Sequence, residues 1–152
     1  MTGRTVVSIH VSPSTRLPMK SVQRAQVQAG RGIEGDRYEN TRHRHVSVQS
    51  TGELAEASAR FGATIEPGLT RRNITVTGGG LPRTPGHRIT VGEVELEVVR
   101  DAAPCRIMDF EIGEGARAAL RRRGGVICRV LSGATIDVGA SVAVAEEVES
   151  SP

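Results

Sequence analysis

The chain has 152 residues, which fits one domain large enough to bury a core without disulfides or structural metals. Its 20 lysine and arginine residues outnumber 17 aspartate and glutamate residues, for a formal net charge of +3, and its aromatic residues are limited to Tyr38, Phe61 and Phe110. This mild positive charge and the shortage of stacking side chains argue against a nucleic-acid partner and fit an arginine pocket for one small anion better.

Short strands separated by glycine-containing loops are predicted in the first third of the chain. Alternating apolar and polar residues indicate three of them: Thr5–Val11, Val22–Val27 and His45–Gln49. Residues 30–38 form a glycine-punctuated loop, where backbone N–H groups can approach a ligand closely. The loop matches neither a Walker sequence nor a dinucleotide-binding fingerprint. Within it, we expect Asp36 and Arg37 to form an ion pair that fixes the loop.

Two short helices are predicted. One runs from Glu53 to Phe61, with Ser50 or Thr51 as its N-cap and Gly62 at its end. The other lies within Gly113–Arg123 and ends in three arginines, which suit the negative end of a helix dipole. These arginines therefore have a structural explanation that needs no ligand.

Further strands are predicted in the second half, which makes a β-rich fold the expected class. They are Leu69–Val76, Arg88–Val99 as two strands around a Gly92-Glu93 turn, Val126–Leu131, and Ala134–Val144 as one or two strands broken at Gly139. Abundant valine and 18 scattered glycines favour short strands and turns over a helical bundle. We expect a single domain over residues 1–152, ordered at about 5–145 and frayed at 146–152.

Cys105 is the residue with the most distinctive local chemistry. It follows the second strand of the Arg88–Val99 pair, and Pro104 stiffens the turn that presents it. Arg100 and Arg106 flank it, and nearby cations stabilise a thiolate, which is a good ligand for a soft metal. The alternative is that Cys105 is an ordinary buried side chain, because free cysteines are often buried.

The remaining candidate groups point to structural roles. Cys128 is expected to pack within its strand, and the two cysteines form neither a zinc motif nor a redox motif. His43 and His45 would share one face of a strand, but two ligands do not make a metal site. The sequence shows no signal peptide and no apolar run long enough to cross a membrane, so we expect a cytoplasmic protein with free cysteines and no membrane partner.

Several segments, taken in order, resemble the MOSC domain, the module named after the C-terminal domain of molybdenum cofactor sulfurase. The match runs nearly end to end and rests on these segments: Lys20-Ser21-Val22, Gly32–Arg37, Arg71–Gly78, Gly86, Gly92, Pro104-Cys105 and Gly124–Gly139. Single segments are weakly specific, whereas the Gly-Asp-Arg block, the arginine and asparagine strand start and the Pro-Cys pair form a specific set. Ala134 and Ala140 depart from the family pattern in the closing strands, where we expect the fold to tolerate them.

This resemblance implies a mainly β, barrel-like fold with a few short helices and a molybdenum–molybdopterin cofactor. By position, the implied site has one catalytic thiolate that ligates the metal, three residues that hold the phosphate of the pterin, and two that line the pocket: Cys105; Lys20, Ser21 and Arg37; and Arg71 and Asn73. Lysine, arginine and hydroxyl groups are the donors that a phosphate needs. The family also carries an association with pyridoxal phosphate binding.

The resemblance further implies a stand-alone member related to the amidoxime-reducing proteins. It would be an oxidoreductase that reduces N-hydroxylated small molecules, with electrons from a separate donor protein because the chain resembles no electron-transfer module. Two alternatives stay open. Cys105 could carry a persulfide in a sulfur carrier or cofactor-handling module, or the chain could be a non-catalytic anion-binding domain. The sequence does not fix the oligomeric state.

Overall fold

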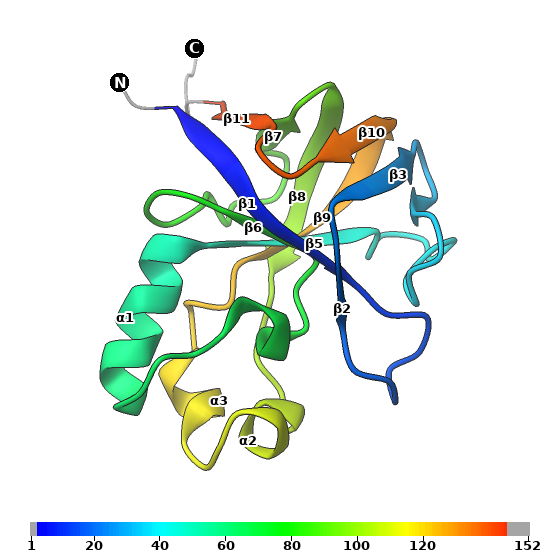
Figure 1. Ribbon diagram of the computed structural model, residues 1–152. Helices are drawn as coiled ribbons and strands as arrows, with labels where there is room; N and C mark the ends of the chain where they lie inside the picture. The colour runs from blue at the N-terminus through cyan, green and yellow to red at the C-terminus, as the bar shows by residue number, and fades with distance from the viewer. Residues whose placement is uncertain (1–2, 146–152) are drawn as a thin grey trace.

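The computed structural model describes residues 3–145 (Figure 1). The tail predicted at 146–152 lies outside the described residues. Within residues 3–145, no helix is long and apolar enough to cross a membrane.

A closed barrel of seven strands forms the body of the molecule. Its strands follow one another around the barrel in the order β11 (Ser141–Val144), β7 (Arg88–Val91), β8 (Val94–Asp101), β9 (Val126–Ser132), β5 (Val46–Ser50), β6 (Ile74–Val76) and β1 (Arg4–Val11). The barrel closes where β1 pairs with β11, with Arg4 opposite Val142. Neighbours in the barrel are antiparallel except β5 and β6, which are parallel. The expected barrel-like, mainly β fold is therefore confirmed.

Four short strands complete the sheets. Strand β2 (Lys20–Val22) extends the barrel beyond β1, and a smaller sheet has the order β10 (Ala134–Asp137), β3 (Arg24–Gln28) and β4 (Gly32–Ile33). The strand predicted over Val22–Val27 is thus two strands, because β2 pairs with β1 whereas β3 pairs with β10.

Aliphatic side chains fill the barrel. In β8, Val94, Leu96 and Val98 are buried while Glu95 and Glu97 are partly exposed, as the alternating sequence predicts. The strands opposite contribute valine and isoleucine, and no aromatic side chain belongs to this core cluster. Val-rich strands are therefore sufficient to close the barrel.

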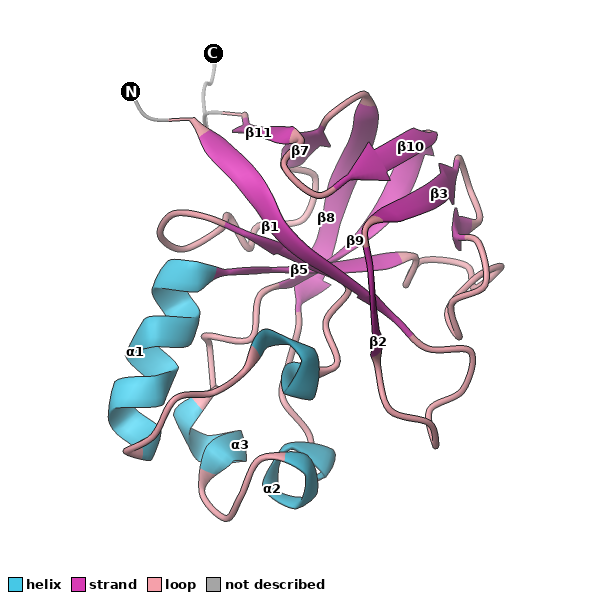
Figure 2. Cartoon of the chain, in the orientation of Figure 1, coloured by secondary structure: helices cyan, strands magenta, loops and turns pink. Residues whose placement is uncertain are grey.

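Helices α1 (Thr51–Phe61), α2 (Ile107–Glu111) and α3 (Ala116–Ala119) gather on one side of the barrel, away from the small sheet (Figure 2). They share a second apolar cluster that includes Leu54, Ile65 and Met108. The expected N-cap is confirmed for Ser50, whose hydroxyl accepts a hydrogen bond from Glu53 N at 3.2 Å. Gly62 ends α1 in the left-handed region, as expected.

Two predictions about secondary structure were wrong. The helix expected over Gly113–Arg123 is only α3, because Gly115 before it has φ 96° and Arg122 after it has φ 63°. The strand expected over Leu69–Val76 is only β6, preceded by the 3-10 turn η1 (Pro67–Thr70). Proline suits the first position of such a turn. The β-branched residues of the segment favour a strand, so the sequence pattern did not indicate the turn.

Candidate functional site

Cys105 lies on the loop between β8 and α2. Before it, Ala102 is fully buried and its N–H donates to the carbonyl oxygen of Gly125 at 2.9 Å. After it, the N–H of buried Met108 donates to the carbonyl oxygen of Cys105 at 3.0 Å. The side chain of Cys105 is exposed, so the alternative that it is an ordinary buried residue is wrong. The loop is anchored on both sides and presents the thiol outward.

Arg72 fixes this loop from inside the protein. Its Nε donates to the carbonyl oxygen of Gly124 at 2.7 Å, and its Nη2 donates to those of Ala102 at 2.9 Å and Ala103 at 3.3 Å. Burial lowers the pKa of Arg72 to about 10, with a further lowering from neighbouring Arg44 and an opposite effect from Cys105. Arg72 therefore stays charged at neutral pH.

Arg37 belongs to the same group of positive charges. Its Nη1 forms the expected ion pair with Asp36 at 3.2 Å, with both side chains nearly fully buried. Its Nη2 donates to the carbonyl oxygen of Arg71 at 3.0 Å, and its Nη1 contacts the sulfur of Met19 at 3.3 Å. The Nε of Arg37 is buried and has no hydrogen-bond partner among the described residues. One donor of this guanidinium is thus left without a partner among the described residues.

Tyr38 carries two guanidinium groups on its ring. The Cζ of Arg37 lies 4.5 Å and that of Arg44 lies 4.2 Å from the ring centroid. Cations over an aromatic face are attracted by its quadrupole, which helps to hold two like charges close together. The Nε of Arg44, like that of Arg37, is buried without a described partner. The ring of Tyr38 therefore organises two arginines that each retain one unsatisfied donor.

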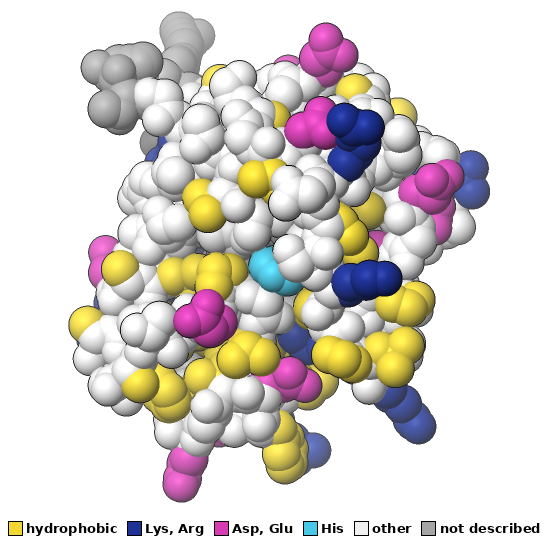
Figure 3. All heavy atoms as spheres, viewed as in Figure 1, with side chains coloured by type: hydrophobic (Ala, Val, Ile, Leu, Met, Phe, Trp, Pro, Cys, Tyr) yellow, Lys and Arg dark blue, Asp and Glu magenta, His cyan; other side chains and the backbone are white. Residues whose placement is uncertain are grey.

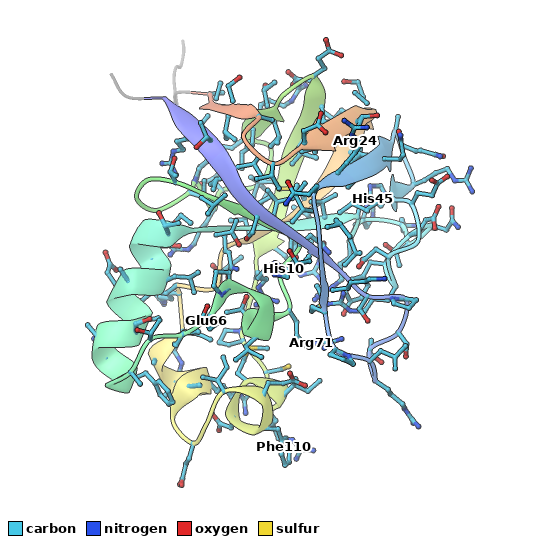
Figure 4. All side chains as sticks on the ribbon, in the orientation of Figure 1. His10, Arg24, His45, Glu66, Arg71 and Phe110 are labelled. Carbon is cyan, nitrogen blue, oxygen red and sulfur yellow. The ribbon has the colours of Figure 1, made fainter. Side chains whose placement is uncertain are left out.

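Arg71, labelled in Figure 4, ends η1 with φ 65°, a left-handed conformation that is uncommon for a residue with a side chain. Its Nη2 donates to the carbonyl oxygen of Ser14 at 3.3 Å. Burial lowers its pKa, and the charge of Arg37 lowers it further, while Glu111 acts in the opposite direction. The left-handed backbone at Arg71 thus accompanies a buried side chain that lies near the charge of Arg37.

Asn73 joins three segments through its amide. Its Oδ1 accepts hydrogen bonds from Ser47 N at 3.0 Å and Ser47 Oγ at 3.2 Å. Its Nδ2 donates to the carbonyl oxygen of His10 at 3.1 Å and to Oδ1 of Asp36 at 3.3 Å. These contacts use both donors and both acceptor positions of the amide. Asn73 therefore positions Asp36, the carboxylate that pairs with Arg37.

Lys20 and Ser21 lie on β2, and both are exposed. In the pairing with β1, Lys20 stands opposite Val11 and Ser21 opposite His10. Their neighbour Met19 contacts Arg37. The structure thus joins Arg37 to Arg71 directly and to Asn73 through Asp36. It places the two β2 residues on the adjoining strand, while Cys105 is linked to this group through Arg72.

The arginine cluster, defined as Arg37, Arg44, Arg71 and Arg72, has a positive balance. The carboxylates that act on it are Asp36, in direct contact with Arg37, and Glu111, which acts on Arg71. In the part of the chain that the structure describes, no group of three or more His, Cys, Asp and Glu side chains could hold a metal ion. The positive balance of the cluster suits an anion.

Comparison with known proteins assigns the family. A family model of the MOSC domain matches residues 10–143. The chain belongs to the MOSC domain family. Domains of this family are associated with molybdenum cofactor binding. No curated protein sequence matches the chain.

Solved structures share the MOSC fold at low sequence identity. The YuaD protein from Bacillus subtilis has a TM-score of 0.80 at 16% identity, covering 93% of this chain and 94% of that one. YiiM from Geobacillus stearothermophilus has a TM-score of 0.71 at 18% identity, covering 94% and 75%. YiiM from Escherichia coli has a TM-score of 0.71 at 15% identity, covering 99% and 73%. These likenesses establish the fold and leave the roles of individual side chains to the chemistry of the site.

Sequence reasoning missed two members of the cluster in this MOSC domain. Arg72 stands next to Arg71, the arginine that matches the family pattern. Arg44 lies in a run of basic residues and histidines, of which only the histidines suggest a specific chemistry. The one sequence feature that could have indicated a buried role for Arg72 is its place just before an apolar strand, where a charged residue is unusual. His45 is buried and its two ring nitrogens contact backbone atoms of Thr41 and Val130, while His43 is exposed.

Proposed function

We propose that this MOSC protein binds a molybdenum–molybdopterin cofactor at the arginine cluster and reduces N-hydroxylated small molecules. The observation that carries the proposal is an exposed thiol, Cys105, on a loop fixed by a buried arginine beside further arginines with unsatisfied donors. A buried donor without a partner costs about 1–3 kcal/mol, so a ligand that satisfies it gains binding energy. An anionic cofactor with a soft metal matches both halves of this arrangement.

The residues fit the phosphate of such a cofactor. The Nε atoms of Arg37 and Arg44 are buried and without partners, and guanidinium groups bind phosphate through charge-assisted hydrogen bonds. Lys20 and Ser21 are exposed on β2 and would add an ammonium and a hydroxyl. Arg71 would add charge. Asn73, whose amide is fully used, would position the Asp36–Arg37 pair rather than touch the cofactor.

The residues also fit the metal. Cys105 is exposed, whereas burial raises the pKa of the Cys128 thiol to about 12. Only the thiolate is a good metal ligand, so Cys105 is the cysteine that would bind the metal. Arg72 would hold the loop of Cys105 in place and contribute positive charge near the thiolate. Pro104 and the contacts of Ala102 and Met108 would limit movement of the loop.

When bound, the cofactor would supply two-electron chemistry that removes oxygen from an N–OH group. The balance is R–NHOH + 2 e⁻ + 2 H⁺ → R–NH₂ + H₂O. The chain holds no other redox group among the described residues apart from its two free thiols. We therefore propose that a separate donor protein delivers the electrons.

The test is the molybdenum and pterin content of protein made in a host that supplies the cofactor. We expect near-stoichiometric molybdenum in the wild type and its loss, together with loss of N-hydroxylamine reduction, in Cys105→Ser. Cys128→Ala is the matched control and should keep both. Retained activity with unchanged molybdenum in Cys105→Ser would refute the proposal.

A second candidate rests on the same exposed thiol. In a sulfur carrier, Cys105 would hold a persulfide next to the positive charge of Arg72. Mass spectrometry of freshly purified protein would then show one added sulfur on Cys105 without stoichiometric pterin. Absence of molybdenum and of added sulfur, with cofactor available, would leave the arginine cluster as a plain anion-binding site.

A further inference from the structure

A groove of about 430 Å³ lies on the outer face of β1, between β2, η1 and α2. His10, labelled in Figure 4, lies at the centre of this face, and Figure 3 shows apolar side chains around the histidine. The volume falls within the range of small-molecule sites. The groove adjoins the arginine cluster, because its lining residue Met19 contacts Arg37.

A β-bulge directs polar side chains into the groove. The pairing of β1 with β6 shifts register between Val6 and Ser8. Val6 and Ile9, three residues apart, both belong to the barrel core, which strict alternation would forbid. The bulge therefore leaves Ser8 and His10 on the outer face, where both line the groove.

Two polar atoms at this face are buried and have no partner. Oγ of Ser8 and Nδ1 of His10 make no hydrogen bond with any described residue. Buried polar groups in folded proteins are nearly always paired, so each such atom requires an explanation. The opposite edge of the His10 ring packs on η1, because a Cβ added at Gly68 would stand 2.9 Å from Nε2. The ring thus packs against η1, and its Nδ1 has no hydrogen-bond partner among the described residues.

The remaining lining combines apolar walls with negative charge. Pro18, Met19 and Leu69 contribute apolar surface, and the exposed side chains of Glu66 and Glu111 contribute carboxylates. Burial lowers the pKa of His10, so its ring is neutral at neutral pH and one nitrogen is an acceptor. A hydroxyl oxygen, an imidazole nitrogen and carboxylates are all acceptors, whereas apolar walls favour a hydrocarbon body.

We propose that this groove binds a small primary ammonium compound with an apolar body, with Ser8 and His10 accepting N–H hydrogen bonds and Glu66 and Glu111 balancing its charge. An ammonium carries three N–H donors, which matches acceptors converging from several sides. The groove shares its lining residue Ser21 with the proposed phosphate site, but its carboxylates favour the opposite sign of charge from the arginine cluster. It needs no cofactor, so its test is independent of the proposed activity.

The probe is phenethylamine, titrated into cofactor-free protein and followed by amide NMR shifts and calorimetry. For a ligand of this size we expect a dissociation constant on the order of 1 mM, with shifts concentrated in β1 and η1. 3-Phenylpropanoate has the same body and the opposite charge, and it should not bind there. Equal binding of the carboxylate, or no response of β1 to phenethylamine, would overturn the proposal.

Variants separate the groups involved. Ser8→Ala and His10→Gln should each weaken binding about three- to tenfold, the range for one hydrogen bond. Ser132→Ala and His43→Gln change exposed residues outside the groove and should leave binding unchanged. Unchanged affinity in both Ser8→Ala and His10→Gln would also refute the assignment.

Gly68→Ala tests the position of the ring without removing a polar group. Its new Cβ would displace the ring of His10, because the Cβ and Nε2 of His10 would otherwise stand 2.9 Å apart. We expect weaker phenethylamine binding with unchanged cofactor content. Binding at wild-type affinity in this variant would show that the position of His10 does not matter.

Discussion

Arg72 holds the backbone just before Cys105 through hydrogen bonds to carbonyl oxygens. The guanidinium donates to the carbonyl oxygens of Ala102 and Ala103, and the thiol in turn acts on the pKa of Arg72. The same group donates to Gly124, just before β9, so one side chain links the loop after β8 to the loop before β9. The position of the thiol therefore depends on a residue that need not touch any ligand.

Arg72→Lys should destabilise the protein and loosen the Cys105 loop. Lysine keeps the charge but cannot form the three-carbonyl fork, so we expect a loss of about 2 kcal/mol in the free energy of unfolding, typical of hydrogen bonds to a buried charge. Urea unfolding measures this, and the amide hydrogens of Ala102, Ala103, Cys105 and Arg106 should exchange faster. Arg121→Lys, on an exposed arginine, is the control. A free energy of unfolding equal to that of the wild type would contradict the role assigned to Arg72.

The two cysteines should differ sharply in reactivity. Cys105 is exposed, whereas Cys128 is fully buried and its pKa is raised to about 12 by burial. Because only thiolate reacts, iodoacetamide should label Cys105 in the native protein and Cys128 only after unfolding. Peptide mass spectrometry in the presence and absence of urea checks this. Labelling of Cys128 at a similar native rate would mean that β9 opens readily.

Asn73→Asp should disrupt the support of Arg37. The substitution removes the Nδ2 donor to Asp36 and places a second carboxylate beside it in a buried site. We expect a loss of about 2–3 kcal/mol in the free energy of unfolding, measured in urea, from the lost hydrogen bonds and the added buried charge. Asn40→Asp is the control on an exposed residue. An effect equal to that of Asn40→Asp would show that the network around Asn73 contributes little.

The sequence was informative where a local pattern reports burial. The alternation in β8 predicts which of its side chains face the core, and Ser50 and Gly62 mark both ends of α1. Helix α2 was missed, because a five-residue helix with one fully buried side chain, Met108, gives no periodic signal. Local sequence patterns therefore predict helices of several turns and strands of ordinary length, but not a helix as short as α2.

The candidate site could be predicted only in part, because its contacts join distant segments. The Asp36–Arg37 pair was predicted because the two residues are neighbours. The partners of Arg72 lie 30, 31 and 52 residues away, and no local pattern indicates them. The stacking of Arg44 on Tyr38 likewise depends on how the loop before β5 folds back. The family resemblance supplied positions, whereas the positioning roles of Arg72 and Asn73 came from the structure.

Stability should fall as the pH drops below about 6.5, the ordinary pKa of histidine. Burial lowers the pKa of His45, whose Nδ1 accepts a hydrogen bond from Val130 N at 2.9 Å and whose Nε2 is 2.9 Å from the carbonyl oxygen of Thr41. The neutral ring satisfies both contacts, whereas a proton on Nδ1 would remove the acceptor for Val130. Burial also lowers the pKa of His10.

The sign follows from these directions. A histidine whose pKa is lower in the folded state adds stability that is present above its unfolded pKa and is lost as the pH falls through the folded pKa. We expect the free energy of unfolding in urea to be lower at pH 5 than at pH 7, and the NMR titration midpoint of His45 to lie below 6.5, the ordinary value for histidine. A midpoint of His45 above 6.5 would contradict this reading.

Gly125→Ala should be among the most damaging small substitutions in the barrel. Gly125 has φ 89°, and an added Cβ would overlap the carbonyl oxygen of Val48 in the neighbouring strand β5. Gly139→Ala is the matched control, since Gly139 has φ 97° but an added Cβ meets nothing within 4 Å. The control should lose about 1 kcal/mol from the left-handed backbone alone, whereas Gly125→Ala should lose several kcal/mol more or fail to fold. The difference between the two variants in the free energy of unfolding in urea measures the cost of separating the start of β9 from β5. Equal effects would mean that the start of β9 can move away from β5 at little cost.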